Sequence, residues 1–339
     1  MTPATAATSG LDAATTELLT GSLREVLAHS PDGSGLGDAL AELGWDEVLA
    51  DDQPTATTLL FTEHGRALAT SRVLDKVLLT ELAPNLPPLG PEPRVPFYPR
   101  GSAAPVAPDA PLAGLLLGEL DNAAEVVIPV ALDGRVGLSL IPADLLTALT
   151  RPAAGFDPAS PWQLVDGPVA DLARYAVSED ASHSWDRAVA LGRLAVAAEI
   201  IGVCTAALQL AVEHTSARVQ YGRQIATFQS VRHRLSESHV AIESARSLLL
   251  VAWTALTHPD SGTSAARLAK LRAGWAQAEV TRHTLQVCGA MGLSLEHPLH
   301  RHVSRAAALD ALLGGHRALT AQLGAELLTG AEFDPIVEI

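Results

Sequence analysis

The sequence has 339 residues, enough for two or three domains with a sizeable core. It is 48% hydrophobic but only 4% aromatic, so its core must consist mainly of Ala, Leu and Val, which suits closely packed helices. The formal net charge of −15 argues against partners such as nucleic acid or an anionic membrane surface. The two cysteines, Cys204 and Cys288, form no disulfide framework or metal knuckle, and we expect both to be small buried hydrophobes.

No leader segment with a basic start and an apolar centre is recognisable at the N-terminus. No run of about 18 uncharged apolar residues is clear enough to span a bilayer. Composition and hydropathy therefore predict a soluble, cytoplasmic protein that binds neither nucleic acid nor a membrane.

Residues 1–85 are expected to form a helical N-terminal domain. The helical pattern is interrupted at Ser30–Gly33 and again near Asp51–Pro54, where proline, glycine and aspartate favour a turn. Residues 40–50 and 64–79 are amphipathic, which predicts helices that bury one face. For both segments, packing against the core is a sufficient explanation of the pattern.

Residues 86–180 are predicted to form a small β domain. The composition changes abruptly at Pro84, and ten prolines between Pro84 and Pro111 exclude a regular helix there. The dipeptide Asp133-Gly134 favours a hairpin turn between two apolar runs. The short apolar runs of this domain are residues 112–120, 124–132 and 134–142.

Residues 181–339 are predicted to form a bundle of four antiparallel helices. Apolar residues recur every three or four positions in each helix, and glycine-containing loops separate the helices. The last helix is expected to carry Leu309, Leu312, His316, Leu319 and Leu323.

The segment His214–Gln229, HTSARVQYGRQIATFQ, lies between the first two helices of this bundle. Its pattern indicates a helix end, a tight turn and the start of the next helix, and Gly222 can adopt the positive φ angle that the turn requires. Arg218 lies one helical turn before Gly222, and Gln229 opens the second helix. A basic helix–turn–helix joint with no further role would explain this segment on its own.

Two further motifs follow, Gln286-Val-Cys-Gly289-Ala-Met-Gly292 and Glu296-His-Pro-Leu-His-Arg301-His. In this order and spacing, the three motifs resemble those of the acyl-CoA dehydrogenases, where the first lies in the joint between the first two bundle helices. The resemblance covers the C-terminal half well, the N-terminal domain weakly and the β domain barely. The family's Thr-Glu-Pro and Gly-Ser-Asp elements are missing from the β domain, and Ala290 replaces a glycine of the second motif.

The resemblance implies a mainly α fold with an N-terminal helical domain, a small middle β domain and a C-terminal four-helix bundle, and it implies FAD as the cofactor. In that family, residues of the turn and of the second motif reach across a subunit interface to an FAD that the neighbour mainly binds. This assigns Arg218, Gln229, Gln286 and Gly289 to cofactor binding. An arginine suits a diphosphate because its planar fork is always charged, and glutamine amides pair with ribose or adenine. Ordinary helix capping remains the alternative for both glutamines.

The resemblance also places Arg193 near the bound CoA thioester, with a solvated charge as the alternative. These enzymes use a glutamate to remove the proton α to the thioester. Counted without gaps from His297, the usual position of this base falls on Leu313, or on Gly314 if the alignment is shifted by one residue. Its alternative position falls on Gly192, so we assign no catalytic residue. Asp310 and Glu199 are nearby acids for which we expect solvated or helix-capping roles.

His297, His300 and His302 lie close together in the sequence, but they lack a rigid scaffold and a carboxylate partner, so we predict no metal site. The sequence also contains no Gly-x-Ser-x-Gly elbow, phosphate loop or paired-cysteine motif.

The chain as a whole resembles the non-catalytic subunit of the actinobacterial α2β2 acyl-CoA dehydrogenases, which act on steroid side-chain CoA thioesters. Leu312–Gly315 resembles the ending of such subunits. The resemblance implies a heterotetramer with a catalytic subunit, an acyl-CoA substrate and a partner's FAD site that this chain completes. Two alternatives remain: a self-sufficient homomeric enzyme with Asp310 or a β-domain acid as base, and a scaffolding protein without flavin.

Overall fold

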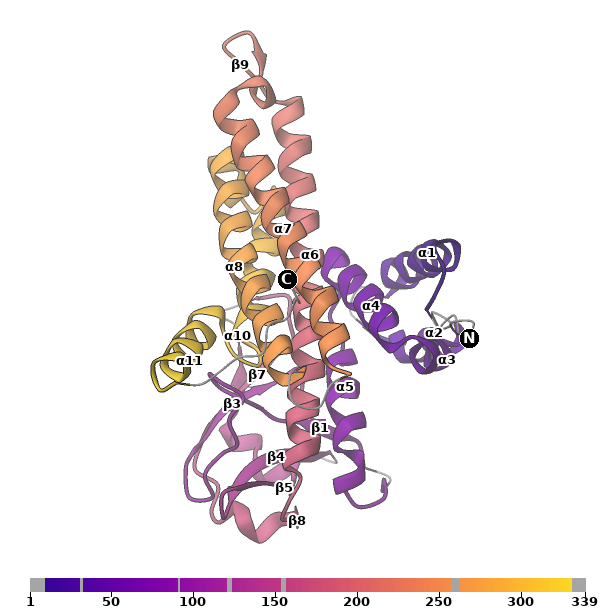
Figure 1. Cartoon of the computed structure of the whole chain (residues 1–339), viewed down its shortest axis with the longest axis vertical. Helices are drawn as coiled ribbons and strands as arrows, with labels where there is room; N and C mark the ends of the chain where they lie inside the picture. Colours follow the sequence, from indigo (N-terminus) through magenta and orange to yellow (C-terminus); the bar gives the residue numbers. More distant parts are fainter. Residues whose placement is uncertain are drawn as a thin grey trace, which may run out of the picture.

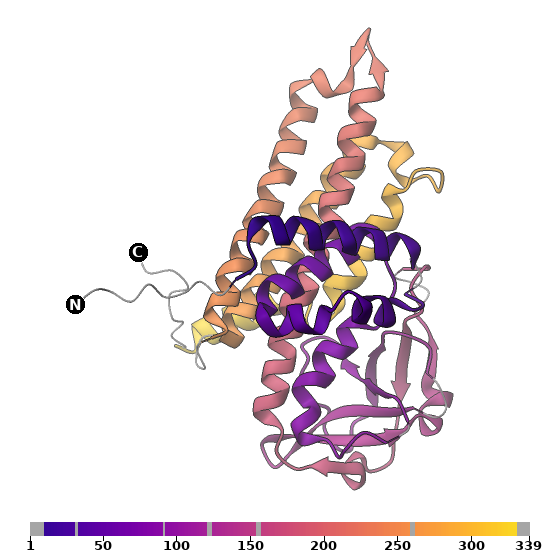
Figure 2. The ribbon, with the colours of Figure 1, turned by 90° about the vertical axis from the view of Figure 1, so that its right-hand side faces the viewer.

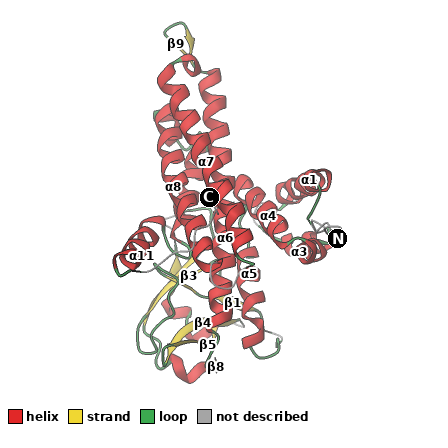
Figure 3. Ribbon diagram, in the orientation of Figure 1, coloured by secondary structure: helices red, strands yellow, loops and turns green. Residues whose placement is uncertain are grey.

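The computed structural model describes residues 10–30, 33–90, 92–120, 124–153, 157–257 and 262–330. Long helices form a bundle along the longest axis, further helices lie beside it, and the strands gather mainly at one end (Figures 1 and 3). The mainly α fold with a small β region between two helical ones is therefore confirmed. The domain boundaries at residues 85 and 180 stay predictions.

The N-terminal helices begin at side chains that cap them. The Asp12 carboxylate accepts the Thr15 N–H at 2.7 Å at the first helix, and Asp52 accepts the Thr55 N–H at 3.0 Å at the fourth. Figure 2 shows the first helix lying across the bundle. These helices are α1 (Ala13–His29), α2 (Leu36–Glu42), α3 (Trp45–Asp51), α4 (Gln53–Ala67) and α5 (Val73–Leu82), and the short 3₁₀ helix η1 (Ala83–Asn85) follows them.

Both amphipathic N-terminal segments are interrupted, which the hydrophobic pattern does not reveal. Gly44 has φ +66° and separates α2 from α3. Leu68 has φ +52° and ends α4, after which the ring of His64 lies 2.8 Å from the Ser71 hydroxyl. Local hydrogen bonds at these left-handed residues turn the chain, while apolar residues continue on both sides of each break.

The β region consists of two four-stranded sheets, ordered β1-β4-β5-β8 and β2-β3-β7-β6. Most pairs are antiparallel, but β1 and β4 run parallel. A separate apolar core, which includes Phe97, Ile128 and Val165, lies in this region. The strands are β1 (Arg94–Pro96), β2 (Tyr98–Pro99), β3 (Leu112–Leu116), β4 (Glu125–Leu132), β5 (Arg135–Pro142), β6 (Thr150–Pro152), β7 (Gln163–Gly167) and β8 (Ala176–Ser178), with 3₁₀ turns η2 (Ala143–Leu145), η3 (Thr147–Leu149) and η4 (Leu172–Tyr175).

The hairpin predicted at Asp133-Gly134 is confirmed. Leu132 pairs with Arg135 across a two-residue loop that joins β4 to β5. Asp133 and Gly134 have φ angles of +47° and +80°, as a type I′ turn requires.

The bundle is built on α6, which packs against the N-terminal helices as well as against its bundle neighbours. At the far end of α6, a two-stranded hairpin forms the tip seen at the top of Figure 1. The elements of this part are α6 (Ser182–Ala217), β9 (Val219–Gln220), β10 (Arg223–Gln224), η5 (Ile225–Thr227), α7 (Gln229–Ala255), α8 (Gly262–Cys288), α9 (Ala290–Leu293), α10 (Leu299–Ala311) and α11 (His316–Leu328).

The expected last helix is wrong, because the chain breaks at Leu312–Gly315. Leu313 and Gly314 have φ angles of +53° and +105°, which end α10. After this break α11 packs against α8 and points away from the long axis (Figure 1). Within the described residues, the fourth member of the bundle is therefore the shorter α10.

Glycine allows α4 and α6 to approach closely. A Cβ added at Gly202 would lie 2.0 Å from the Thr62 carbonyl oxygen, and one added at Gly65 would lie 2.2 Å from the Glu199 carbonyl oxygen. The backbones of the two helices therefore touch at this crossing, which fixes the N-terminal helices on the bundle.

By length and hydropathy, α6 alone among the described helices would suffice to cross a bilayer, although the sequence pattern did not single it out. Within its most apolar stretch, 67% of the residues are buried inside the protein. This burial is what the central helix of a folded bundle requires.

Candidate functional site

The tip of the bundle carries the turn motif. Tyr221 and Gly222 have φ angles of +52° and +76°, so the positive φ expected at Gly222 is confirmed. The Tyr221 ring meets the Phe228 ring edge-on at 6.2 Å, and the Arg223 guanidinium lies 4.2 Å above the same Phe228 ring. These ring contacts fold the hairpin back on the start of α7 and leave Tyr221 almost fully exposed.

Arg218 ends α6 at the base of this hairpin. Its backbone N–H donates to the His214 carbonyl at 2.9 Å, and its own carbonyl accepts the Ile225 N–H at 2.9 Å. The side chain is exposed, and its guanidinium makes no hydrogen bond or ion pair with the described residues. The backbone of Arg218 is therefore held by hydrogen bonds, while its exposed guanidinium is accessible to another molecule.

The other residues assigned to cofactor binding lie at the same end of the bundle. Gln229 is the first residue of α7, and within the described residues its amide nitrogen has one hydrogen-bond partner, the His233 ring at 3.4 Å. Gln286 is exposed in the last turn of α8, and Gly289 follows it with φ +61° and open space beside its Cα. A small apolar cluster of α6, α7, α8 and α10, which includes Ala211 and Val287, holds these helix ends together.

The two positions at which the family's bases were expected lie against each other. A Cβ added at Gly192 on α6 would lie 2.6 Å from Leu313 Cδ1 and 3.0 Å from Leu78 Cδ1. Leu313 is 1% exposed, and Leu74 on α5 closes the same space. Residues that are 121 positions apart in the chain thus form one apolar contact where a carboxylate would be needed for proton abstraction.

Arg193, next to Gly192, is buried rather than solvated. Its Nε donates to the Leu313 carbonyl at 3.0 Å, and its Nη2 donates to the Ser102 carbonyl at 3.4 Å. Burial, and to a lesser extent the nearby Arg267, lowers the pKa of Arg193 to about 10. The guanidinium therefore braces the Leu313 loop against the β region, and its contact with a thioester stays a prediction.

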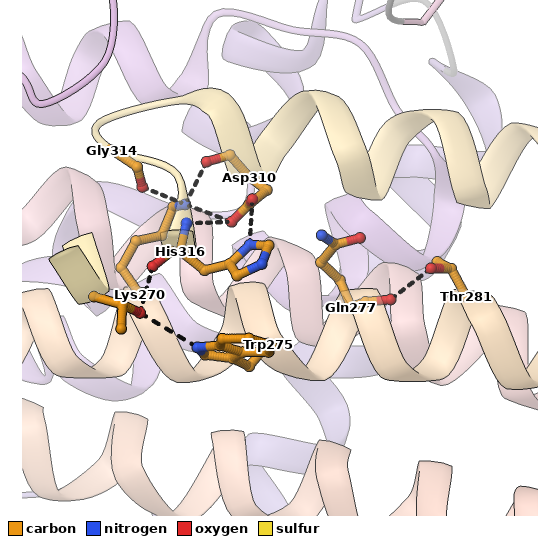
Figure 4. A network of polar contacts seen from close by, with 8 residues as sticks. Lys270, Trp275, Gln277, Thr281, Asp310, Gly314 and His316 are labelled. Atoms are coloured by element: carbon orange, nitrogen blue, oxygen red, sulfur yellow. Dashed lines mark hydrogen bonds and ion pairs between the residues drawn. The ribbon is translucent and has the colours of Figure 1, made fainter. Parts of the chain in front are cut away.

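Figure 4 shows how the loop after α10 is held from the other side. Lys270 on α8 is fully buried, and its Nζ donates to the carbonyls of Asp310 and Gly314 at 3.0 and 3.2 Å. Burial lowers the pKa of Lys270 to about 8. Asp310 accepts the backbone N–H of His316 at 3.1 Å and lies 2.6 Å from its Nδ1. Asp310 therefore caps the start of α11, which is the helix-capping role that we expected for this acid.

Glu199 belongs to a buried ionic cluster, so the solvated role expected for it is wrong. Its Oε1 lies 3.1 Å from His64 Nδ1 on α4 and 3.7 Å from Arg305 Nη1 on α10. Arg305 Nε in turn lies 2.9 Å from Asp157 Oδ2 in the β region, and all four side chains are less than 10% exposed. The cluster therefore joins three parts of the molecule.

Asp75 is a buried acid that the sequence analysis missed. It lies in an amphipathic helix, and the pattern was interpreted from the apolar residues of that helix alone. Tyr98 Oη donates to Asp75 Oδ1 at 2.7 Å, while Oδ2 is buried without a hydrogen-bond partner among the described residues. Burial raises the pKa of Asp75 to about 7. Tyr98 lies in the proline-rich segment after Pro84, and the sequence does not show that this segment packs against α5.

Among the described residues, no three His, Cys, Asp or Glu side chains are placed to hold a metal ion. His297 packs edge-on against the His214 ring at 5.6 Å, and His302 is buried with Nδ1 3.2 Å from the Pro298 carbonyl. Both cysteines are buried and free, as expected.

Residues 168–328 match the family model described as acyl-CoA dehydrogenase, C-terminal domain. The acyl-CoA dehydrogenase IpdE2 of Mycobacterium tuberculosis is 33% identical over 132 residues, which cover 39% of this chain and 40% of that protein. The chain thus spans less than half of the length of this curated relative.

Two solved structures share the fold of nearly the whole chain. The ChsE4-ChsE5 complex from Mycobacterium tuberculosis aligns with a TM-score of 0.74 at 20% identity, covering 95% of this chain and 99% of the matched one. The Tcur3481-Tcur3483 steroid ACAD aligns with a TM-score of 0.69 at 20% identity, covering 93% and 98%. At this identity the likeness shows the fold alone.

Proposed function

Because residues 168–328 belong to the acyl-CoA dehydrogenase family and the chain has that family's fold, we propose that it is a subunit of a heteromeric, FAD-dependent acyl-CoA dehydrogenase. The complex would dehydrogenate a CoA thioester between its α and β carbons, and this chain would supply no catalytic base. The steroid ACAD with the same fold supports a steroid side chain as the acyl group. The ChsE4-ChsE5 complex contains two differently named chains, which supports a catalytic partner in an α2β2 heterotetramer.

The observation that carries the proposal is the contact between Leu313 and Gly192. A base for this reaction must present a carboxylate beside the α carbon of the thioester. Here the two expected positions hold a leucine and a glycine, and Leu78 closes the space between them. Asp310 is nearby, but its oxygens are engaged by His316, and its distance from Lys270 Nζ is only 3.6 Å.

The tip residues fit the assigned cofactor. FAD, when bound, would accept the hydride from the β carbon. Arg218 would bind the pyrophosphate, since its guanidinium has no partner among the described residues and points from a fixed helix end. The Gln229 and Gln286 amides would pair with ribose or adenine, and the open space at Gly289 would admit the ligand close to the backbone. All of these groups are exposed, so they would serve a flavin held mainly by another subunit.

The proposal is tested by counting flavin per complex. The chain is co-expressed with candidate catalytic subunits, the complex is purified, and FAD is measured by absorbance against protein. In Arg218→Ala, the loss of charge-assisted hydrogen bonds should weaken FAD binding roughly 10- to 100-fold, so the variant complex should lose flavin on dilution.

Arg246→Ala is the matched control, because Arg246 is an exposed arginine of α7 whose one ion pair in the described part of the chain is with Glu243, at 2.7 Å. This variant should keep the flavin content of the unmodified complex. An Arg218→Ala complex with unchanged flavin would overturn the role of the tip and favour a scaffolding function. A chain that is purified alone, is yellow and dehydrogenates an acyl-CoA would overturn the need for a partner.

Asp75 favours a second candidate, a self-sufficient enzyme with an atypical base. Its pKa of about 7 suits a general base near neutral pH, and its Oδ2 is unpartnered within the described part of the chain. If this candidate holds, the isolated chain turns over an acyl-CoA and Asp75→Asn abolishes the reaction. Without activity of the isolated chain, Asp75 has only a structural role.

A further inference from the structure

A serine and a histidine of the N-terminal part of the chain meet a glutamate of α6. His64 Nε2 lies 2.8 Å from the Ser71 hydroxyl oxygen, and His64 Nδ1 lies 3.1 Å from Glu199 Oε1. The side chains of His64 and Glu199 are 3% and 5% exposed, whereas Ser71 is half-buried. Hydroxyl, imidazole and carboxylate in this order are the groups that activate a serine as a nucleophile.

The backbone holds these three side chains together. Leu68 has φ +52° and ends α4, so the chain turns and returns Ser71 to the ring of His64, seven positions earlier. Glu199 reaches the same ring because α4 and α6 cross closely at Gly65. The sequence has no Gly-x-Ser-x-Gly motif at this serine, so the arrangement becomes visible only in the folded chain.

The charges around His64 favour the protonated ring that forms when it takes a proton from serine. Glu199 and Asp157 carry two negative charges, and Arg305 supplies one positive charge. A protonated His64 would therefore make this group of four neutral. In the uncharged ring, the nearby Glu199 favours a proton on Nδ1, so Nε2 accepts from Ser71. Nδ1 has no hydrogen bond among the described residues, so Glu199 acts on the ring through its charge.

Ser71 lines a cavity of about 850 Å³ between α5 and the helices α2, α3 and α4. Volumes of about 300–1,000 Å³ are usual for small-molecule sites. Buried apolar side chains of the wall, such as Leu60 and Phe61, would hold an apolar group beside the hydroxyl. The wall alone does not define a reaction, whereas the serine does.

The start of α5 lies directly after Ser71. The backbone N–H of Val73, the first residue of α5, lies 3.4 Å from Ser71 Oγ. The first N–H groups of a helix have no carbonyl partner within it and form the positive end of its dipole. They would stabilise the negative charge that develops on a carbonyl oxygen when Ser71 attacks the carbonyl carbon.

This place is separate from the Leu313–Gly192 contact, because the two lie on different faces of α5. Leu74 faces Gly192, whereas Val73 and Val77 line the cavity. Chemistry at Ser71 would therefore not use the place where proton abstraction was expected.

We propose that Ser71, His64 and Glu199 form a hydrolytic site that cleaves an ester or thioester of an apolar acid. Ser71 Oγ attacks the acyl carbon while His64 Nε2 takes the hydroxyl proton. The bond to the leaving group breaks, and His64 gives the proton to the departing alcohol or thiol. Water then attacks the acyl-serine, with His64 again taking and returning the proton, so that a carboxylic acid leaves and Ser71 is restored. Glu199 is a positioning residue.

This inference goes beyond the proposed dehydrogenase subunit, since the reaction consumes water and transfers no hydride. The test is covalent labelling of the purified full-length chain with a fluorophosphonate, which reacts with activated serines, followed by mass spectrometry of its peptides. One label per chain, on Ser71, is expected, together with hydrolysis of p-nitrophenyl butyrate.

Ser71→Ala should remove this label and slow the hydrolysis at least about 100-fold, because the nucleophile is lost. Ser247→Ala is the matched control, since Ser247 is an exposed serine of α7 whose hydroxyl donates to the Glu243 carbonyl at 2.9 Å. This variant should label and hydrolyse like the unmodified protein. Thermal melting verifies that each variant is folded.

Glu199→Gln separates a positioning role from a purely structural one. Loss of the negative charge beside Nδ1 makes protonation of the ring less favourable, so the acid limb of the labelling rate should move to lower pH by about one unit. A structural role alone would lower the rate without moving this limb. If Glu199→Gln does not fold, the labelled position in the unmodified protein decides.

Absence of a label on Ser71 in the unmodified protein would overturn the proposal. Equal hydrolysis by the unmodified protein and Ser71→Ala would also overturn it, because another group would then cleave the ester. An unmoved acid limb in folded Glu199→Gln would remove Glu199 from the site. The labelling contains neither FAD nor acyl-CoA, so its result is independent of the flavin count per complex, and either proposal can fail while the other stands.

Discussion

The two ends of α6 differ in what their polar side chains do. In the first half of the helix, Arg193 and Glu199 are buried, and both are engaged by other parts of this chain. At the end of the helix, Arg218 is exposed and has no side-chain partner in the described part of the chain. The first arrangement holds one molecule together, whereas the second is the one that the proposed function assigns to the FAD of another subunit. Stability and cofactor binding should therefore respond to different substitutions.

The largest effect on stability is expected when an acid is placed against the buried first half of α6. Leu313→Glu should lower the free energy of unfolding by roughly 3–5 kcal/mol near pH 8, because a carboxylate would be buried against Leu78 and Gly192. Burial raises the pKa of such a group, so the lost stability should return in part as the pH falls below that raised value. Urea denaturation at about pH 5 and pH 8 measures both effects.

Leu313→Met serves as the control and should cost less than about 1.5 kcal/mol, since it conserves volume and polarity. A Leu313→Glu variant as stable as the unmodified protein at both pH values would show that the position is open to solvent. It would then be reasonable to reconsider Leu313 as part of a working active site.

Removing Arg305 should have the next largest effect. Arg305→Met would leave Glu199 and Asp157 buried without their shared cation, at a cost of about 3–5 kcal/mol. Arg246→Met, which breaks an exposed pair on α7, should cost less than about 0.5 kcal/mol. Chemical denaturation of the two variants compares a buried with an exposed arginine. Similar losses in both would contradict the ionic cluster that joins α4, α6, α10 and the β region.

Asp75 should make stability depend on pH. Its folded pKa of about 7 lies above the ordinary value, so the folded state holds this proton more tightly, and the stabilisation is lost as the pH rises toward 7. The unmodified protein should therefore lose on the order of 1 kcal/mol per pH unit between about pH 4 and pH 7, relative to Asp75→Asn. Thermal or urea denaturation across this range measures the difference. Parallel pH profiles would mean that the carboxyl is not buried.

The smallest effect on stability is expected at the tip. Tyr221→Ser removes an exposed ring whose aromatic contact within the described residues is with Phe228, so the free energy of unfolding should change by less than about 0.5 kcal/mol. A loss above about 2 kcal/mol in urea denaturation would show that the tip is part of the core. That result would remove the contrast between the two ends of α6.

The sequence predicted the parts of the fold that have a strong local cause. The Asp133-Gly134 hairpin and the positive φ of Gly222 follow from turn chemistry. The stripes of the long helices follow from 3.6-residue periodicity. The breaks at Leu68 and Leu313 could not be predicted, because both are leucines in left-handed conformations that tertiary contacts impose.

Residues of the candidate site could be predicted from the sequence only where they belong to a recognisable motif. Gly192 and Leu313 were identified one by one, but their contact across 121 positions depends on how α6 and the loop after α10 pack. The Asp75–Tyr98 pair and the Glu199 cluster depend on contacts between domains, which periodicity within one helix does not encode. The Ser71–His64 contact likewise depends on the left-handed turn at Leu68, which tertiary contacts impose.

The chain contains only two lysines, and the structure buries one of them. Lys270 is fully enclosed beneath the loop after α10, whereas Lys76 is 66% exposed at its side chain. Apart from the α-amino group, an amine-reactive dye would therefore attach to a single lysine side chain of the native protein, that of Lys76 on α5. Its emission would report on events at α3 and α5 without any engineered cysteine.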